Sequence, residues 1–439
     1  MRNEKNRKFI FLANPSVGHT NFLISLAVKA KENAREVVFL LPGLKNKTIK
    51  KFIDDPSLNI DLRLKKYSIP YKLIPIALTQ IILGAMLPYK SGLNEVLFAL
   101  KVLTAGSKQY TKFLMNEFLK ERPDVIVYDY TFFPAIAVSE KLQLPRVAIY
   151  HSGLPFLEYP IPPFGFYFKY GTYSQNIFNN HRQLILKLEK DLKLKYEEII
   201  NQTILTDFIL SPNSNFLNII NTIKEAEYPR NNLADNILFT GPSIQEHSDY
   251  RVKPFFNKKD KKLIYISLGT VYNKKPDLFI KIINSIKYAG SEILVSAGDS
   301  YNKLKDMSFN ANVHIEKFVP QIHVLYHTDV FITHGGKNSI NEALKIGVPM
   351  ILFPVGGEQK YNAQLVEFLN AGIDFGDIKD SFSVQHMTEA IKRLFIDKTI
   401  ISSVKKLSEK HQNTDGAIIA YDEICKKLHT LYDENNRDT

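Results

Sequence analysis

The sequence predicts an α/β protein made of two doubly wound parallel sheets that face each other. Short apolar runs alternate with amphipathic helical runs, and a strand, a helix and a second strand within residues 8–41 form one βαβ unit. The same alternation restarts at residue 263. Between the two series lies a polar and basic stretch, residues 245–262, which is typical of an interdomain linker. The pattern therefore indicates two α/β units joined in sequence.

The first half of the chain contains the elements of one such sheet. Residues 8–13 and 36–41 predict buried strands around a helix that opens at His19, and residues 124–128 predict another parallel strand. The other elements expected before the linker are helices at 133–143 and 184–201 and strands at 146–150, 208–211 and 237–240. Residues 50–120 hold apolar, aromatic and helical segments that the pattern does not order.

The second half repeats the alternation and ends in helices. Its expected strands are 263–269, 292–298, 329–333 and 348–354, and its expected helices are 277–289, 338–347, 383–397 and 401–411. A last helix from residue 416 to about 432 precedes a polar tail. We therefore expect an N-terminal domain over 1–242, a linker over 243–262, a C-terminal domain over 263–415, and over 416–439 a helix that packs back on the N-terminal domain, followed by the tail.

Composition and charge exclude some classes of function. The formal net charge is +12, but the lysines are scattered rather than gathered with aromatics in an arginine-rich patch, which argues against nucleic-acid binding. The charge fits either a Lys- and Asn-rich composition or contact with an anionic membrane surface. One cysteine, Cys425, excludes an internal disulfide and suits a reducing compartment. The expected location is the cytoplasm, with peripheral attachment to the inner face of the membrane as the alternative.

The apolar segments are too short for a signal peptide or a membrane-crossing helix. The N-terminal apolar run spans only about five residues, which is less than a signal-peptide core. The longest apolar segment, residues 73–87, is interrupted by Pro75, Gln80 and Gly84 and falls short of the roughly 20 residues that span a bilayer.

Polar residues follow the strand at 329–333, at the point where it gives way to a helix. His334 ends the strand, and Gly335 and Gly336 allow a ligand to approach the backbone closely. A helix that begins directly after them presents N–H groups and the positive end of its dipole, which favours a phosphate. Asn338 and Ser339 could bind that phosphate or, alternatively, only cap the helix. In open α/β sheets ligands bind at this edge.

Three further sets of polar residues lie near predicted strand ends. Glu342 shares a helix face with the phosphate residues and could hold two vicinal hydroxyls of a ribose, or it could cap the helix or face solvent. Ser267 and Thr270 end the first strand of the second half and could add donors to the phosphate pocket, or form a plain turn. Glu358 and Gln359 could bind sugar hydroxyls, or form a solvated turn. No P-loop lysine is present in this region.

In the first half, a histidine and an aspartate end two predicted parallel strands. His19 follows the first strand and Asp129 ends the strand at 124–128, so both are expected on one rim of the sheet. A carboxylate that orients an imidazole makes a general base. The alternatives are a capping or buried role for His19 and a helix N-cap role for Asp129. The histidines show no paired spacing of the H-E-x-x-H kind, so we expect no metal site built by the protein.

Taken together, these motifs resemble the nucleotide-sugar signature of the family 1 UDP-glycosyltransferases, in the variant of the bacterial macrolide glycosyltransferases. The matching runs occur in the same order along nearly the whole chain. They are P-x-x-G-H-T at 15–20, P-D-V-I-V-Y-D at 123–129, S-L-G-T at 267–270, F-V-P-Q at 318–321, T-H-G-G-x-N-S-x-x-E-A-L-x-x-G-V-P at 333–349 and P-x-x-x-E-Q-x-x-N-A at 354–363.

The resemblance implies a GT-B fold, with two Rossmann-like domains and a cleft between them, the N-terminal domain for the acceptor and the C-terminal one for the donor. It also implies inverting transfer of a hexose from a UDP-sugar, with His19 as the base and Asp129 offsetting its charge. No metal and no further cofactor are implied. The donor-binding residues that it implies are Ser267, Thr270, His334, Gly336, Asn338 and Ser339 at the diphosphate, Glu342 at the ribose, Phe318, Val319 and Gln321 at the uracil, and Glu358 and Gln359 at the sugar.

Two positions depart from the family pattern. Phe318 stands where the family usually has Trp, and it offers uracil a smaller face. The usual Gly-His before the second strand is replaced by residues 33–35, which indicates a changed turn. Neither position belongs to the proposed base.

The leading hypothesis is a UDP-glucosyltransferase that acts on a hydroxyl of a lipophilic small molecule. The apolar segment 69–88 and the aromatic loop 152–173 fall where the family builds its acceptor pocket, although both could be ordinary core. A nucleotide-sugar epimerase of the same architecture is one alternative, and a lipid-binding protein without catalysis is another. The sequence does not indicate an oligomeric state.

Overall fold

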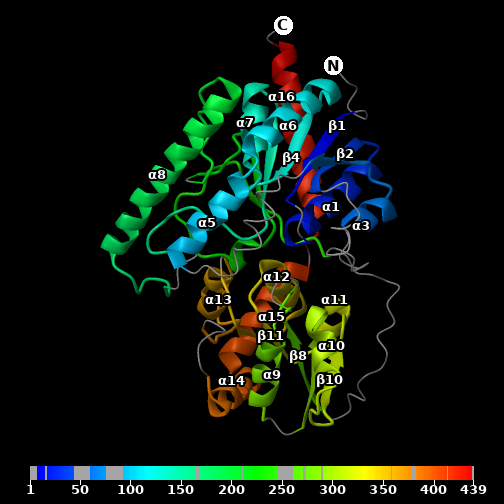
Figure 1. Ribbon diagram of the computed structural model, residues 1–439, viewed down its shortest axis with the longest axis vertical. Helices are drawn as coiled ribbons and strands as arrows, with labels where there is room; N and C mark the ends of the chain where they lie inside the picture. The colour runs from blue at the N-terminus through cyan, green and yellow to red at the C-terminus, as the bar shows by residue number, and fades with distance from the viewer. Residues whose placement is uncertain are drawn as a thin grey trace.

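The computed structural model describes most of the chain in two lobes, with both ends at the top of Figure 1. The described residues are 7–14, 17–43, 60–75, 92–164, 168–209, 211–244, 261–269, 273–287, 290–356, 358–376, 382–412 and 414–437. Thr270, most of the expected linker 243–262, positions 76–88 of the apolar segment and positions 165–167 of the aromatic loop lie outside these ranges. For those segments, the structure can be compared with the sequence predictions only at the described residues.

The upper lobe is built on a seven-stranded sheet in the order β3-β2-β1-β4-β5-β6-β7. Every pair of neighbouring strands is parallel. The chain starts at β1, moves outward to β3 and then returns past β1 to β4, which is the doubly wound arrangement expected from the sequence. The strands are β1 Lys8–Leu12, β2 Glu36–Gly43, β3 Tyr71–Pro75, β4 Val125–Asp129, β5 Arg146–Tyr150, β6 Leu217–Ile220 and β7 Ile237–Phe239.

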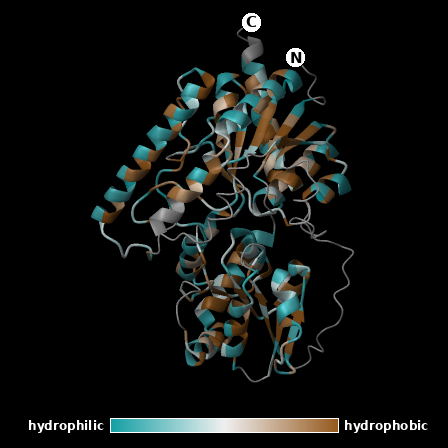
Figure 2. Cartoon of the chain, in the orientation of Figure 1, coloured by the Kyte–Doolittle hydropathy of each residue, from teal (hydrophilic) through white to brown (hydrophobic). Residues whose placement is uncertain are grey.

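Helices cover both faces of this sheet because its strands are apolar on both sides (Figure 2). Alternate residues of β1 belong to two clusters: Phe9 packs with α1, α3 and α16, and Ile10 packs with α6, α7 and α8. The helices of this lobe are α1 Val17–Glu32, α3 Ile60–Lys66, α5 Gly92–Thr104, α6 Ser107–Glu121, α7 Phe133–Lys141, α8 Gln175–Ile200 and the 3-10 turn η3 Lys224–Ala226, with α16 Gly416–Arg437 from the end of the chain.

The lower lobe is a six-stranded parallel sheet in the order β10-β9-β8-β11-β12-β13. Its strands are β8 Lys262–Ser267, β9 Ser291–Ser296, β10 Val313–Glu316, β11 Val330–Thr333, β12 Met350–Leu352 and β13 Gly372–Asp374. Its helices are α9 Pro276–Ser285, α10 Tyr301–Leu304, α11 Gln321–Leu325, α12 Lys337–Ile346, α13 Glu358–Phe368, α14 Val384–Ile396 and α15 Lys398–Gln412, with the 3-10 turn η4 Gly298–Ser300.

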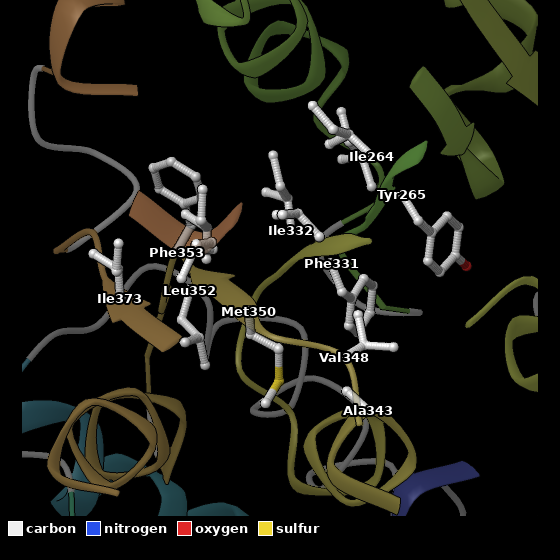
Figure 3. Close-up of a cluster of buried hydrophobic side chains, with 14 of the residues drawn as sticks. Ile264, Tyr265, Phe331, Ile332, Ala343, Val348, Met350, Leu352, Phe353 and Ile373 are labelled. Atoms are coloured by element: carbon white, nitrogen blue, oxygen red, sulfur yellow. The ribbon is translucent and has the colours of Figure 1, made fainter. Parts of the chain in front are cut away.

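The register of the lower sheet places its apolar side chains in rows. Tyr265, Phe331 and Met350 are paired across three strands and therefore face the same side, where Tyr265 and Phe331 stack with ring centroids 5.0 Å apart. Ala343 of α12 lies on this side of the sheet (Figure 3). Full burial of these side chains fixes α12 against β11, the strand that leads into it.

One expected strand is wrong. Residues 208, 209 and 211 form no strand, and the sixth strand is β6, a few residues further on. Phe208 is apolar because it packs between helices, with its ring 5.1 Å from that of Tyr196 and 5.6 Å from that of Phe133. A short apolar run cannot by itself distinguish a strand from such a packing segment. The strands β3 and β13 were not predicted at all, and β13 lies in residues 372–380, which the sequence indicates as a loop.

None of the helices in the described part of the chain combines the length and the apolarity that a membrane crossing requires.

The last helix, α16, packs on α1 of the upper lobe (Figure 1). Ile424 and Leu428 are fully buried there with Phe9 and Leu26. Arg35 Nε, in the turn before β2, donates a hydrogen bond of 2.9 Å to the hydroxyl of Tyr421. The chain therefore crosses to the lower lobe and returns, so the end of the sequence contributes to the core of the N-terminal sheet.

Ile424→Ala is expected to destabilise the N-terminal lobe by about 2–5 kcal/mol, because it removes a fully buried side chain and leaves a cavity. Ile418→Ala on the same helix is the matched control: that side chain is 40% exposed, and its loss should cost much less. Equilibrium denaturation, with hydrogen exchange to assign the transition to the N-terminal sheet, measures both. Equal losses would contradict this packing of α16.

Candidate functional site

The carboxyl ends of both sheets border one cavity of about 380 Å³ between the lobes. All but two of the residues that the sequence predicted for the site line it. These are His19, Ser267, Phe318, Val319, Gln321, His334, Gly336, Asn338, Ser339, Glu342, Glu358 and Gln359. Of the other two, Asp129 lies directly behind His19, and Thr270 is outside the described residues. We call this space the donor cavity, after the nucleotide-sugar donor that the sequence resemblance implies for these residues.

His19 and Asp129 form a direct pair. His19 lies in the first turn of α1, just after β1, and Asp129 is the last residue of β4, the neighbour of β1. His19 Nδ1 contacts Asp129 Oδ2, and Asp129 Oδ1 accepts hydrogen bonds from the backbone N–H and hydroxyl of Thr131 at 2.9 and 2.7 Å. The N-cap of α7 is Phe132, so the alternative that Asp129 is merely a helix cap is wrong.

Burial and charge set the protonation of this pair. Desolvation opposes ionisation of the Asp129 carboxyl, but the imidazoles of His19 and His151 and the hydrogen bonds hold its pKa well below the usual range. Desolvation likewise lowers the pKa of His19, but the adjacent carboxylate outweighs it and raises that pKa above the ordinary value. Asp129 is therefore a carboxylate that orients the imidazole and favours its protonated form.

His334 is held between two glycines. A Cβ on Gly269 would lie 2.7 Å from its Nε2, and a Cβ on Gly336 would lie 2.8 Å from the same atom. Both positions must therefore lack a side chain for the His334 ring to lie at the N-terminus of α12. Desolvation lowers the pKa of His334 to about 4, although a hydrogen bond with the backbone of Ser267 opposes this, so the ring is neutral near pH 7.

The N-terminus of α12 has no side-chain cap. Its N-cap residue is Gly336, so the alternative in which Asn338 and Ser339 only cap the helix is wrong. Asn338 Nδ2 instead donates a hydrogen bond of 3.3 Å to the carbonyl of Gly18, in the first turn of α1. Backbone N–H groups without side-chain acceptors at a helix start can bind an anion in the donor cavity.

Gln321 connects two residues of α12 that line the donor cavity. Its Nε2 donates to Ser339 Oγ at 3.0 Å and to Glu342 Oε2 at 2.6 Å. Because Glu342 lines the cavity and accepts this hydrogen bond, the alternative of a solvent-facing glutamate is wrong. Desolvation raises the pKa of Glu342 to about 7. Phe318 is 41% exposed at the mouth of the cavity, whereas Val319 beside it is buried. An aromatic ring and a carboxylate in the lining of one cavity suit a base and a ribose.

Glu358 and Gln359 begin α13 on the opposite wall. The side-chain Oε1 of Gln359 accepts the backbone N–H of Val355 at 3.0 Å, which closes the turn after β12. Desolvation raises the pKa of Glu358, although the nearby His19 opposes this. Both side chains are held in the wall and do not belong to a solvated turn.

A second cavity, of about 360 Å³, adjoins the first and is lined mainly by the upper lobe. We call it the acceptor cavity, after the acceptor that the sequence resemblance implies for the N-terminal domain. His19, Ser152, Glu358 and Gln359 line both cavities. Its other walls are mainly apolar and aromatic, and include Leu100, Leu103, Tyr130, Phe133, Tyr150, Phe156, Phe164, Ile185 and Phe208. A hydrophobic molecule with a polar group at the shared wall would fit this space.

A second face of α12 holds the two lobes together. Asn341 Nδ2 donates to the carbonyl of Asn221 at 2.8 Å, and its Oδ1 accepts from the hydroxyl of Thr222 at 2.9 Å. Lys337 Nζ, one turn earlier, donates to the carbonyl of Ala226 at 3.3 Å. All of these polar groups are buried, so each contact would be costly to lose.

Sequence reasoning missed His151 and Ser152, which directly follow β5 and line the donor cavity. The rule that located His334 and Asp129, polar residues at the end of a parallel strand, applies equally to β5. Asn21 and Lys317 also line the donor cavity, and no motif pointed to them.

Within the described ranges, one group of side chains has the composition of a metal site. Its members are His19, Asp129 and His151, whose ligand atoms lie within 4.8 Å of one another. Two of the three already contact each other directly, so an ion would have to displace that contact.

Known proteins resemble the chain in sequence and in fold. A model of the family described as UDP-glucoronosyl and UDP-glucosyl transferase matches residues 172–417. The NDP-glycosyltransferase YjiC of Bacillus subtilis (strain 168) is 25% identical over 418 residues, which cover 93% of this chain and 94% of that relative. Two solved structures share the fold. The calicheamicin glycosyltransferase CalG4 has a TM-score of 0.72 at 16% identity, and the match covers 98% of this chain and 99% of that structure. The glycosyltransferase VinC in complex with DTDP has a TM-score of 0.63 at 13% identity, and the match covers 96% of this chain and 100% of that structure.

Gly269→Ala is expected to disturb His334. Gly269 has a φ of +70°, so a side chain there is strained by about 1–2 kcal/mol before it collides with the imidazole. The collision should add about 1–3 kcal/mol. Gly290→Ala is the matched control, because Gly290 has a φ of +80° and no heavy atom within 4 Å of a Cβ. Chemical denaturation of the C-terminal sheet measures the difference, and equal losses would show that the ring yields freely.

Proposed function

The chain belongs to the UDP-glucoronosyl and UDP-glucosyl transferase family, and we propose that it transfers a hexose, glucose in the first instance, from a UDP-sugar to a hydroxyl of a hydrophobic small molecule. It is a family 1 glycosyltransferase with the two parallel-sheet domains of the GT-B fold. One observation carries the proposal beyond the family: His19, paired with Asp129, lies on the wall that the donor and acceptor cavities share.

In the proposed mechanism, His19 removes the proton from the acceptor hydroxyl. Because Nδ1 faces Asp129, the proton goes to Nε2. The acceptor oxygen then attacks the anomeric carbon of the sugar, the bond from that carbon to the UDP oxygen breaks, and the configuration inverts. Asp129 stabilises the imidazolium that forms, as a carboxylate does for a catalytic histidine in other enzymes.

The departing diphosphate is stabilised in this proposal by the N–H groups at the start of α12 and by His334. Ser267, Gly336, Asn338 and Ser339 line the same part of the donor cavity, and Thr270 belongs to the same proposed set. Hydrogen-bond donors and a helix dipole aimed at developing negative charge supply the stabilisation that such a step needs. The proposal therefore involves no metal and no further cofactor.

Glu342 favours a ribonucleotide over a deoxyribonucleotide, and the family makes uridine the proposed nucleoside. An ionised carboxylate can accept hydrogen bonds from both vicinal hydroxyls of a ribose, and a deoxyribose offers only one of them. Phe318, Val319 and Gln321 then border the base, and Glu358 and Gln359 are placed to bind the hydroxyls of the sugar. YjiC is named an NDP-glycosyltransferase and VinC binds DTDP, so the choice of nucleotide is the point that most needs a test.

The acceptor is proposed to be lipophilic. The acceptor cavity has room for a molecule with a few fused rings, and apolar and aromatic side chains form most of its described wall. We further propose that the protein works in the cytoplasm, with peripheral contact to the inner face of the membrane as an additional state that its net charge of +12 would favour.

The direct test is turnover with purified protein. UDP-glucose is incubated with a panel of phenols, sterols, macrolides and carotenoid alcohols, and released UDP and new glycosides are measured. We expect UDP release that depends on an acceptor, and slower turnover with TDP-glucose. UDP release or sugar epimerisation without an acceptor would favour the epimerase alternative, and donor binding with no release for any acceptor would weaken the proposal.

His19→Ala is expected to lower kcat by about 10² or more, because the acceptor hydroxyl loses its base. The UDP-glucose affinity should change much less, since the phosphate and ribose groups are untouched. His327→Ala, in an exposed loop after α11, is the control for loss of a histidine and should retain full activity. Unchanged turnover in the His19 variant would remove His19 as the base.

Glu342→Gln is expected to abolish a pH dependence of donor binding. The pKa of Glu342 is raised to about 7, so the carboxylate form becomes dominant as the pH rises from 6 to 8. The affinity for UDP-glucose should therefore rise by up to about tenfold over this range in the unaltered protein and stay flat in the variant. Calorimetry measures both, with TDP-glucose as the comparison ligand. A flat profile in the unaltered protein would contradict the ribose role.

A further inference from the structure

His151 lies against both members of the proposed catalytic pair. It directly follows β5, the neighbour of β4 in the sheet, so it reaches the same rim as Asp129. Its ring centroid is 3.9 Å from that of His19, with the two rings tilted by 53°, and its Nδ1 is 3.8 Å from Asp129 Oδ1. On its other side the ring of Tyr130 lies 5.5 Å away. His151 thus fills the space beside the imidazole and the carboxylate.

The contact with Asp129 is too long for a hydrogen bond. Nδ1 of His151 is buried and has no hydrogen-bond partner, and Asp129 Oδ1 already accepts two hydrogen bonds from Thr131. The His151 side chain as a whole is only 8% exposed. Because this nitrogen makes no hydrogen bond, what His151 contributes at this position is the packing of its ring against His19 and Tyr130.

The charge state of His151 decides what role that packing can have. Desolvation, together with the nearby His19, lowers the pKa of His151 to about 3, so this ring is neutral at physiological pH. Because the His151 ring is uncharged, it does not compete with His19 for the charge interaction with the Asp129 carboxylate. The groups that face His19 are Asp129 from β4, His151 after β5 and Glu358 from α13, and Tyr130 is the further titratable group beside His151.

We propose that His151 is a positioning residue for the base: its neutral ring holds the imidazole of His19 against Asp129 and keeps water from that carboxylate. The inference rests on the proposed role of His19. Without the ring, water would solvate Asp129, and the attraction between carboxylate and imidazole would weaken in the higher local dielectric. The His19 ring would also have room to rotate away from the acceptor hydroxyl.

Two consequences for the reaction follow. The acid limb of kcat/KM reports the pKa of the free base, because only the neutral imidazole can accept the proton. Loss of the His151 ring should weaken the pairing that raises the pKa of His19, and the acid limb should move to lower pH. The rate on the plateau should fall, because misorientation of a catalytic group lowers kcat.

The experiment compares His151→Ala with His151→Phe. Phenylalanine retains an apolar ring that packs on His19 and excludes water, whereas alanine does not. We expect His151→Ala to lower the plateau kcat about tenfold or more and to move the acid limb down by about half a pH unit or more. His151→Phe should keep kcat within about threefold and leave the acid limb in place, because packing rather than a hydrogen bond positions the base.

His181→Ala is the matched control. His181 is also buried, but it lies on α8 in the wall of the acceptor cavity. Its loss should change the acceptor KM and leave the acid limb where it is. Rates are measured at saturating UDP-glucose, and calorimetry with UDP-glucose and thermal unfolding establish that each variant is folded and binds donor.

Two results would overturn the inference. One is an alanine variant with the acid limb and kcat of the unaltered protein. The other is a phenylalanine variant as impaired as the alanine variant, which would mean that the ring nitrogens and not the packing matter. Failure of the base assignment is distinct, because it would appear as full activity in His19→Ala.

Discussion

A buried contact between the helix α12 and the N-terminal lobe determines how the donor-cavity residues of α12 lie relative to His19. One face of the helix presents Asn338, Ser339 and Glu342 to the donor cavity, and another presents Lys337 and Asn341 to the N-terminal lobe. Residues four apart share a helix face, so the sequence of one short helix assigns the two faces. The donor groups therefore cannot shift relative to His19 without breaking buried hydrogen bonds between the lobes, and a misplacement of about 1 Å is enough to slow catalysis strongly.

The segment of the N-terminal lobe that follows β6 also binds α13 and the loop that follows β5. The hydroxyl of Tyr361, on α13, donates to the buried carboxylate of Glu227. Arg230, three residues further on, donates hydrogen bonds of 2.9 Å to the carbonyls of Leu154 and Phe156, in the loop that forms a wall of the acceptor cavity. The segment after β6 thus fixes α12, α13 and the acceptor loop together, which explains how one wall can serve both cavities.

Local sequence patterns correctly predicted the residues that lie at the end of a strand. The apolar periodicity around His19, Asp129 and His334 predicted the strands, and the rule that ligands bind at the carboxyl ends of parallel strands predicted the rim. The expected strand at 208–211 failed because Phe208 is apolar for another reason, packing between helices. His151 also follows a strand, but the residues that it contacts come from α1 and β4, and no local pattern indicated those contacts.

The sequence by itself determined the two doubly wound sheets and which polar residues stand at the strand ends, since these follow from short-range periodicity. The family followed from a resemblance of its motifs, which the family model then bore out. Only the tertiary structure decided which of those residues meet. The pairing of His19 with Asp129, the approach of Asn338 to Gly18 and the neutral state of His151 depend on sheet order, on the contact of α12 with the other lobe, and on burial. These are long-range properties, and no local spacing in a chain encodes the distance or the dielectric between segments that lie hundreds of residues apart.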